Sequence, residues 1–405
     1  MRNNTNPNQI TLFNSINNGS VAAGGGAKIH SFDDITNFDN ILFAWQIFSH
    51  DKHKRQDVIE FKMNLMDNLY QLHNDLKNRT YTHGSYSHFT ITDPKKRDIH
   101  KSSVRDRIVH HLLYHALYPY FDSKFIHDSY SCRINKGTHK ALNRFEEFSR
   151  KCSRNNTKTC WVLKCDIRKF FASIDHTILK KILYRYISDN DTIGILENII
   201  DSFCAVAVIP DFISQNYLLG KVRDPGYNHT LNSSPGCRFG DRHDNAKYNA
   251  TANKKGLPLG NLTSQLLVNV YMNKFDQFVK HRLKQKYYIR YADDFVFFSD
   301  NKNELEKLLP WVREFLWKEL RLELHPDKVF IKTIASGVDF LGWVHFTDHR
   351  VLRTSTKRRM IRNLKDNQKP AYRTGRPESI ESYKGMMSHG NAWKLQKHYL
   401  SSGLL

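Results

Sequence analysis

Two adjacent aspartates, Asp293 and Asp294, are the side chains of this sequence best suited to chemistry. They lie within residues 286–300, where apolar and aromatic residues on both sides favour two β-strands joined by a tight turn. Carboxylates held at such a turn can bind Mg²⁺, which takes oxygen ligands and is held by one or two carboxylates together with substrate phosphates. The alternative is that both are ordinary polar turn residues, because Asp is common in turns.

A third carboxylate, Asp166, follows a short run over residues 160–165 that reads as a buried strand. Two aromatic residues, Phe170 and Phe171, come soon after it. A strand-terminal Asp and an Asp pair at a strand–turn–strand can converge on two metal ions. Two such ions stabilise the attacking and leaving oxygens of an in-line phosphoryl displacement. The three aspartates therefore predict phosphoryl transfer.

Five stretches of the chain carry motifs in a fixed order: DIRKFF at 166–171, GLPLGNLTSQ at 256–265, YADD at 291–294, LHPDK at 324–328 and FLGW at 340–343. In this order they resemble the motifs of the reverse transcriptases. The resemblance implies an α+β, right-hand polymerase fold, with fingers, a palm that contains an antiparallel sheet, and a helical thumb. It further implies an RNA-directed DNA polymerase. Its catalytic and metal-binding residues, holding two Mg²⁺ ions, would be Asp166, Ile167, Asp293 and Asp294.

The same resemblance assigns residues to the incoming nucleotide. Lys95 and Arg97 match basic positions that hold the triphosphate, and a planar guanidinium and an ammonium both suit phosphate oxygens. Phe171 matches a bulky ring set against the sugar 2′ position, which would exclude a ribose hydroxyl and select dNTPs. The helix after the second motif would carry the base and sugar, with contacts from Leu259, Gly260 and Gln265.

Further roles follow from the resemblance along the rest of the chain. Lys328 is the candidate proton donor to the pyrophosphate leaving group, although an ordinary surface lysine after a turn is the alternative. The residues implied to contact template, primer and duplex are Arg133, Lys136, Leu341, Gly342, Arg358 and Arg359. The last two lie in a strongly basic stretch, 350–376, with ten Lys or Arg against one Asp.

Composition points to the same class of partner. The 405 residues hold 62 Lys or Arg against 40 Asp or Glu, which gives a net charge of +22. So large an excess favours a polyanion, and nucleic acid is preferred over a membrane surface because no apolar run approaches the ~20 residues of a spanning helix. The start of the chain is polar and shows no signal peptide. Six cysteines without a C-x-x-C pair predict a reduced, cytoplasmic protein.

The chain divides into four predicted parts. Residues 1–28 form a low-complexity, disordered tail, 29–155 the fingers, 156–345 the palm and 346–405 a basic helical thumb that follows the duplex backbone. The palm includes a polar insertion, 210–255, which we interpret as a surface loop. A zinc site within it is conceivable, but its Cys and His spacing matches no familiar zinc pattern. Because little sequence follows this thumb, we expect no maturase or endonuclease domain of the kind found in group II intron proteins, which argues against that branch.

Two positions of the GLPLGNLTSQ motif differ from most reverse transcriptases, and the difference indicates a narrower group within that family. Leu259 stands where most reverse transcriptases have Gln, and Gln265 follows Ser264 where they have Pro. This variant resembles the reverse transcriptases of diversity-generating retroelements, within the broader group of intron- and retron-type enzymes. Those enzymes copy a template-repeat RNA, misincorporate opposite adenines and act with a small helical accessory protein. An antiphage-defence or retron-type reverse transcriptase is the alternative, and a non-catalytic RNA-binding scaffold is the alternative from another class.

Overall fold

The computed structural model describes residues 28–92, 96–205, 254–366, 377–393 and 397. The tail predicted over 1–28 and the insertion predicted over 210–255 therefore fall almost entirely outside the described residues, as does Lys95. None of the described helices is both long enough and apolar enough to cross a membrane.

A four-stranded antiparallel sheet in the order β4-β5-β3-β6 carries the predicted motifs. Its strands are Trp161–Asp166 (β3), Tyr288–Tyr291 (β4), Asp294–Ser299 (β5) and Phe330–Thr333 (β6). The expected strand–turn–strand around the Asp pair is thus present as β4 and β5. Because the sheet is covered on both faces, β5 is an almost continuous apolar run rather than an alternating one.

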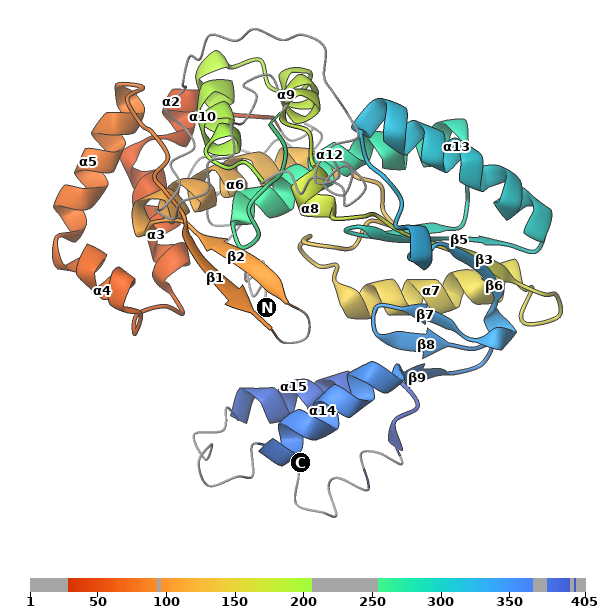
Figure 1. Ribbon diagram of the computed structural model, residues 1–405. Helices are drawn as coiled ribbons and strands as arrows, with labels where there is room; N and C mark the ends of the chain where they lie inside the picture. The colour runs from red at the N-terminus through yellow and green to blue at the C-terminus, as the bar shows by residue number, and fades with distance from the viewer. Residues whose placement is uncertain (1–27, 93–95, 206–253, 367–376, 394–396, 398–405) are drawn as a thin grey trace, which may run out of the picture.

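Alternate residues of the central strands enter two separate cores. On one face Leu163, Cys165, Phe295 and Phe297 join the larger core. On the other face Val162, Val296 and Phe298 join the smaller core. Figure 1 shows helix α13 (Lys302–Leu320) above the sheet and α7 (Thr138–Cys152) below it. This alternation follows from the period of two in a β-strand.

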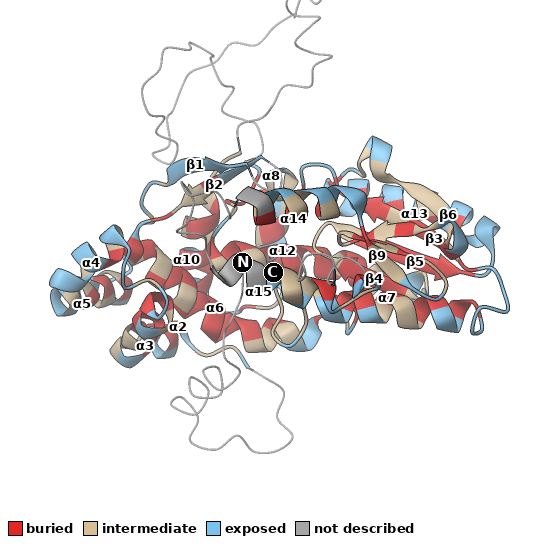
Figure 2. Cartoon of the chain, turned by 90° about the horizontal axis from the view of Figure 1, so that it is seen from below, coloured by how far each residue is buried: buried red, intermediate tan, exposed pale blue. Residues whose placement is uncertain are grey.

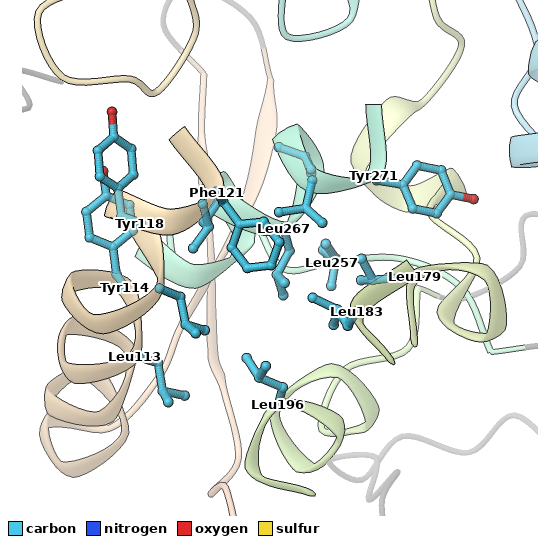
Figure 3. Close-up of a cluster of buried hydrophobic side chains, with 14 of the residues drawn as sticks. Leu113, Tyr114, Tyr118, Phe121, Leu179, Leu183, Leu196, Leu257, Leu267 and Tyr271 are labelled. Carbon is cyan, nitrogen blue, oxygen red and sulfur yellow. The ribbon is translucent and has the colours of Figure 1, made fainter. Parts of the chain in front are cut away.

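The larger core continues into a helical region that precedes and flanks the sheet. Figure 3 shows its centre, where side chains of α6, α9, α10 and α12 meet. The helices of this region are α2 (Phe32–Ile35), α3 (Phe38–Ser49), α4 (Gln56–Met63), α5 (Leu65–Lys77), α6 (Val104–Lys124), α8 (Phe170–Ser173), α9 (His176–Tyr184), α10 (Asn190–Asp201), α12 (Leu262–Gln277) and the π-helix η1 (Phe278–Arg282). A two-stranded hairpin, β1 (Ser87–Ile91) and β2 (Arg97–Lys101), projects from it, and Figure 2 shows this hairpin largely exposed.

The last part of the described chain forms a second small sheet with a pair of helices. The sheet comprises β7 (Val338–Phe340), β8 (Trp343–His345) and β9 (Arg350–Leu352), and the helices are α14 (Thr354–Asp366) and α15 (Pro377–Met387). The segment after α15 packs on this sheet so closely that a Cβ on Gly390 would lie 2.0 Å from the Trp343 ring. The mixture of helices and antiparallel sheets confirms the predicted α+β class.

Candidate active site

The register of the central sheet brings the predicted aspartates together. Asp166, at the end of β3, is the direct cross-strand partner of Asp294, the first residue of β5. Asp293 lies in the adjoining turn, and its carbonyl accepts a hydrogen bond of 3.2 Å from the Ile167 amide. Ala292, in the same turn, has a φ of 56°, a left-handed conformation that is costly for a residue with a side chain. Asp166 and the adjacent pair Asp293 and Asp294, more than 120 residues apart in sequence, thus lie at one end of the sheet.

A short 3₁₀ helix, η2 (Pro326–Lys328), is fixed beside Asp166. The His325 amide donates to the Asp166 carbonyl at 2.7 Å, and Ile167 bridges to Leu324. This placement brings the Lys328 ammonium to 3.0 Å from Asp166 Oδ1, while the Lys328 side chain stays 43% exposed. The lysine that the resemblance singled out therefore contacts the aspartate cluster directly.

A second lysine, Lys164, also contacts the cluster, and the motif comparison did not identify it. Its ammonium lies 3.4 Å from Asp294 Oδ1, and its side chain is only 12% exposed. Lys164 precedes Asp166 by two residues on β3, so both side chains point to the same face of the sheet. The alternation of a strand that ends in a predicted catalytic aspartate was the sequence signal for this residue.

Burial and mutual repulsion act on the aspartates. Burial, reinforced by the negative charges of Asp294 and Asp166, raises the pKa of Asp293 to about 6. Burial also raises the pKa of Asp294, although the nearby Lys164 ammonium opposes that rise. Crowded, partly desolvated carboxylates of this kind are the groups that a divalent cation would stabilise in their charged form.

The residues present fit a divalent cation in one specific respect. Asp294 Oδ1 is buried and accepts no hydrogen bond of good geometry from the described residues, the Lys164 ammonium at 3.4 Å being its nearest cation. The described residues do not, however, gather three His, Cys, Asp or Glu side chains tightly enough to form a ready-made metal cluster. Two of the three aspartates are instead paired with lysines, Asp166 with Lys328 and Asp294 with Lys164. For a metal ion to bind, Lys328 and Lys164 would have to move away from Asp166 and Asp294.

Beneath the turn lies a buried ion pair that sequence reasoning also missed. Arg290 is fully buried, and its guanidinium contacts both carboxylate oxygens of Asp276 at 2.7–3.0 Å. The same guanidinium donates to the side chains of Asn269 and Ser129 and to the Ala292 carbonyl. It therefore connects the left-handed turn residue to helix α12 and to the segment before α7. Arg290 directly precedes the YADD motif, but nothing in its local sequence reveals that it is buried.

The described residues assigned to the nucleotide lie on α8, on hairpin β1–β2 and on the segment that leads into α12. Phe171 is partly buried on α8, whereas its neighbour Phe170 is 4% exposed and belongs to the core. The Phe171 carbonyl accepts from the Leu257 amide, which ties α8 to the GLPLGNLTSQ segment. In that segment Gly260 has a φ of 115°, and an added Cβ would lie 3.2 Å from Ile99 of β2.

Hairpin β1–β2 is thereby joined to the start of α12. The His100 amide donates to the Leu259 carbonyl at 3.2 Å, and the Ser102 hydroxyl donates to Asn261 Oδ1 at 3.2 Å. Arg97 is exposed at the beginning of β2, and Gln265 is half-buried in the first turns of α12. Leu259, Gly260 and Gln265 thus lie on a segment that is hydrogen-bonded to the hairpin carrying Arg97.

Arg133 is a correction to the sequence interpretation. Its guanidinium donates to Asp122 and to the carbonyls of Ile126 and Ser129, and its side chain is only 6% exposed. It braces the loop before α7 and is not available to a template backbone. Lys136 is half-buried, with its ammonium 2.8 Å from the His127 carbonyl.

The other residues assigned to nucleic acid lie in the last part of the described chain. Leu341 and Gly342 form the turn between β7 and β8, with φ values of 51° and 85°. On α14, Arg358 is exposed and Arg359 is half-buried. The turn is tied to the start of α14 because the Arg353 amide donates to the Gly342 carbonyl at 3.0 Å.

An antiparallel sheet with one aspartate at a strand end and two at the neighbouring turn, flanked by helices, defines the palm of a nucleic-acid polymerase. Residues 92–345, more than half of the chain, match the family described as reverse transcriptase (RNA-dependent DNA polymerase). The chain belongs to that family. The predicted right-hand polymerase fold is confirmed.

Similar proteins include protein YkfC of Escherichia coli (strain K12), 25% identical over 295 residues, which cover 65% of this chain and 65% of YkfC. The COX1/OXI3 intron 2 protein of Saccharomyces cerevisiae is 21% identical over 288 residues, which cover 65% of this chain and 31% of that protein. The chain thus spans less than two thirds of either relative. Two apo telomerase structures from Candida tropicalis, one of them truncated from its C-terminal domain, superpose with TM-scores of 0.44 and 0.42 at 13% and 12% identity. They cover 68% and 65% of this chain, and 55% and 47% of the telomerase chains.

Proposed function

We propose that this chain is an RNA-directed DNA polymerase that makes cDNA on a template RNA. The observation that carries the proposal is the sheet register, which sets Asp166 opposite Asp294 with Asp293 in the adjoining turn. With the backbone carbonyl of Ile167, these aspartates would hold two Mg²⁺ ions. Such ions lower the pKa of the primer 3′-hydroxyl and neutralise charge on the triphosphate.

The chain's own groups complete the proposed chemistry. Lys328, at 3.0 Å from Asp166 and partly exposed, can donate a proton to the departing pyrophosphate oxygen. Arg97, exposed on the hairpin joined to the Leu259–Gly260 turn, can hold the triphosphate, and Lys95 is assigned to the same task. The exposed Arg358 of α14 can contact the RNA/cDNA duplex.

Phe171 gives a testable prediction on sugar selection. Replacing Phe171 by Ala is expected to raise the incorporation of rNTPs relative to dNTPs by at least tenfold, because the ring proposed to exclude the 2′-hydroxyl is removed. That factor corresponds to about 1.4 kcal/mol. Single-nucleotide extension with each sugar measures the ratio of kcat/KM values. The matched variant Phe170→Leu changes the adjacent core ring and should leave the ratio unaltered.

The proposed subtype is the diversity-generating retroelement enzyme, and it is supported by Leu259 and Gln265. Leu259 offers the nascent base pair no side-chain hydrogen bond, so geometric checking of that pair should be weaker than with an amide. In this reading the chain acts in the cytoplasm with a template RNA and a small helical accessory protein. The proposed compartment is supported by the sequence, whose six cysteines form no C-x-x-C pair.

The deciding experiment is Mg²⁺-dependent primer extension on a mixed-sequence RNA with all four dNTPs, followed by sequencing of the products. Errors concentrated opposite template adenines would support the retroelement enzyme, and uniformly rare errors would favour a defence or retron-type enzyme. Synthesis that appears only with a cognate RNA and an accessory protein would point to a retroelement complex. Absence of product under every condition, with RNA still bound, would overturn the proposed activity.

A further inference from the structure

We propose that a basic loop behind the catalytic sheet binds the phosphate backbone of RNA outside the copying site. The basic loop comprises residues 281–286, which begin in the last turn of the π-helix η1 and continue toward the start of β4. It exposes the side chains of Arg282, Lys284 and Lys286. The proposal rests on the proposed function, because it takes the template RNA, or a structured region attached to it, as the partner.

The basic loop is held in one conformation by the protein. The Leu283 amide donates to the Phe278 carbonyl, and the Gln285 amide donates to the Val279 carbonyl, each at 3.0 Å. The Lys280 ammonium reaches back to the carbonyls of Gln285 and Lys286 at 3.2 and 3.0 Å. Lys280, which directly precedes the basic loop, thus braces its backbone, and Arg282, Lys284 and Lys286 project from it.

The projecting cations have no acidic neighbour in the described part of the chain. No described carboxylate lies within 4.0 Å of Arg282, Lys284 or Lys286. The sequence contains no Asp or Glu between Asp276, which is buried against Arg290, and Asp293. Lys284 also adopts a left-handed φ of 51°. Like charges crowded on a braced loop repel one another, and a bound polyanion would remove that cost.

The loop lies away from the aspartate cluster. It precedes the edge strand β4, and the catalytic turn follows the same strand. At ~3.3 Å per strand residue, the two ends are separated by on the order of 15 Å. Gln277 of α12 donates to the Lys124 carbonyl at 3.0 Å, which ties the helix that precedes η1 to the end of α6.

The composition of the loop favours RNA over the other classes of partner. Protein interfaces have apolar and aromatic centres and are depleted in Lys, whereas no large hydrophobic side chain in the loop is exposed. An anionic membrane surface also attracts cations, but the loop exposes no large apolar side chain to insert between lipids and strengthen such binding. A phosphate backbone needs only cations in a fixed arrangement.

The test compares two triple variants of the full chain that lose the same charge. The loop variant is Arg282→Gln, Lys284→Gln and Lys286→Gln. The control variant replaces three exposed lysines of α4, α5 and α13, namely Lys62→Gln, Lys77→Gln and Lys307→Gln. Binding of a long structured RNA, and of a short primer–template duplex that fills only the copying site, is measured by fluorescence anisotropy between about 50 and 200 mM salt.

For the long RNA, the loop variant is expected to bind at least tenfold more weakly than the control. The slope of its log affinity against log salt should be smaller by about two, because each lost phosphate contact removes roughly 0.7 to 0.9. Binding and extension of the short duplex should match those of the control.

Two results would overturn the proposal. Equal slopes for the loop variant and the control would mean that the basic loop makes no phosphate contact with the RNA. Loss of short-duplex extension by the loop variant alone would place the loop in the copying site. Failure of the unaltered chain to extend any primer would instead count against the proposed function, because RNA binding is measured without synthesis.

Discussion

Replacement of Asp293 by Asn is expected to abolish DNA synthesis and, at the same time, to stabilise the folded chain. The pKa of Asp293 is raised from 3.8 to about 6, so the charged carboxylate is disfavoured in the folded state. Below pH 3.8 Asp293 is largely protonated in both the folded and the unfolded state, so its burial costs no folding stability. The cost grows between these two pKa values and is complete above pH 6, where it reaches up to about 3 kcal/mol. Asparagine has no charge to desolvate, but it cannot replace the carboxylate as a cation ligand.

The measurements are denaturant unfolding without divalent cations at a pH above 7 and again near pH 4, together with primer extension. The gain in unfolding free energy should be large at the higher pH and nearly absent at the lower one. An exposed carboxylate on α5, replaced as Asp67→Asn, serves as the control and should change neither quantity appreciably. Retained synthesis, or a variant less stable than the unaltered chain at neutral pH, would contradict the proposed role of Asp293.

Replacement of Arg290 by Met is expected to cost roughly 3–5 kcal/mol of folding free energy and to abolish synthesis. The loss of stability follows because Asp276 would remain buried without its partner. The loss of synthesis follows because the guanidinium also holds the Ala292 carbonyl, and with it the turn that carries Asp293.

A double variant, Arg290→Met with Asp276→Asn, separates these two effects. It removes both buried charges and keeps an acceptor for the Tyr288 hydroxyl, which donates to Asp276 at 2.8 Å. The free energy of unfolding should then return most of the way to that of the unaltered chain. DNA synthesis should stay low and should need a higher Mg²⁺ concentration. Recovery of both properties would show that the ion pair serves packing alone.

The environments of Arg133 and Arg290 could not be predicted from the sequence. Arg133 and Arg290 both lie next to motifs, and their local sequences do not distinguish an exposed cation from a buried one. Their environments are set by distant residues, since Arg290 contacts Ser129, which is 161 positions away. Burial of a charge depends on such long-range partners, so the template role assigned to Arg133 was wrong and the role of Arg290 in the turn was missed.

The aspartates and the sheet were accessible from sequence for the opposite reason. Strand alternation and a two-residue turn are local patterns, and they determined which side chains share a face with Asp166. The same rule identifies Lys164 once it is applied two residues upstream. The strand rule does not extend to Phe170 and Phe171, which lie on the short helix α8, where the structure makes Phe170 a core residue and leaves Phe171 partly buried against the same core.

The contact of Gly390 with Trp343 has a practical consequence. The indole ring is 2% exposed and is covered by a residue that leaves no room even for a methyl group. Any displacement of the segment after α15 from the small sheet would admit water to that ring and change its emission. In a chain whose other five tryptophans are replaced by Phe, Trp343 would therefore be an intrinsic fluorescence probe of this movement. Iodide quenching in the presence and absence of an RNA/DNA duplex would read it without any attached dye.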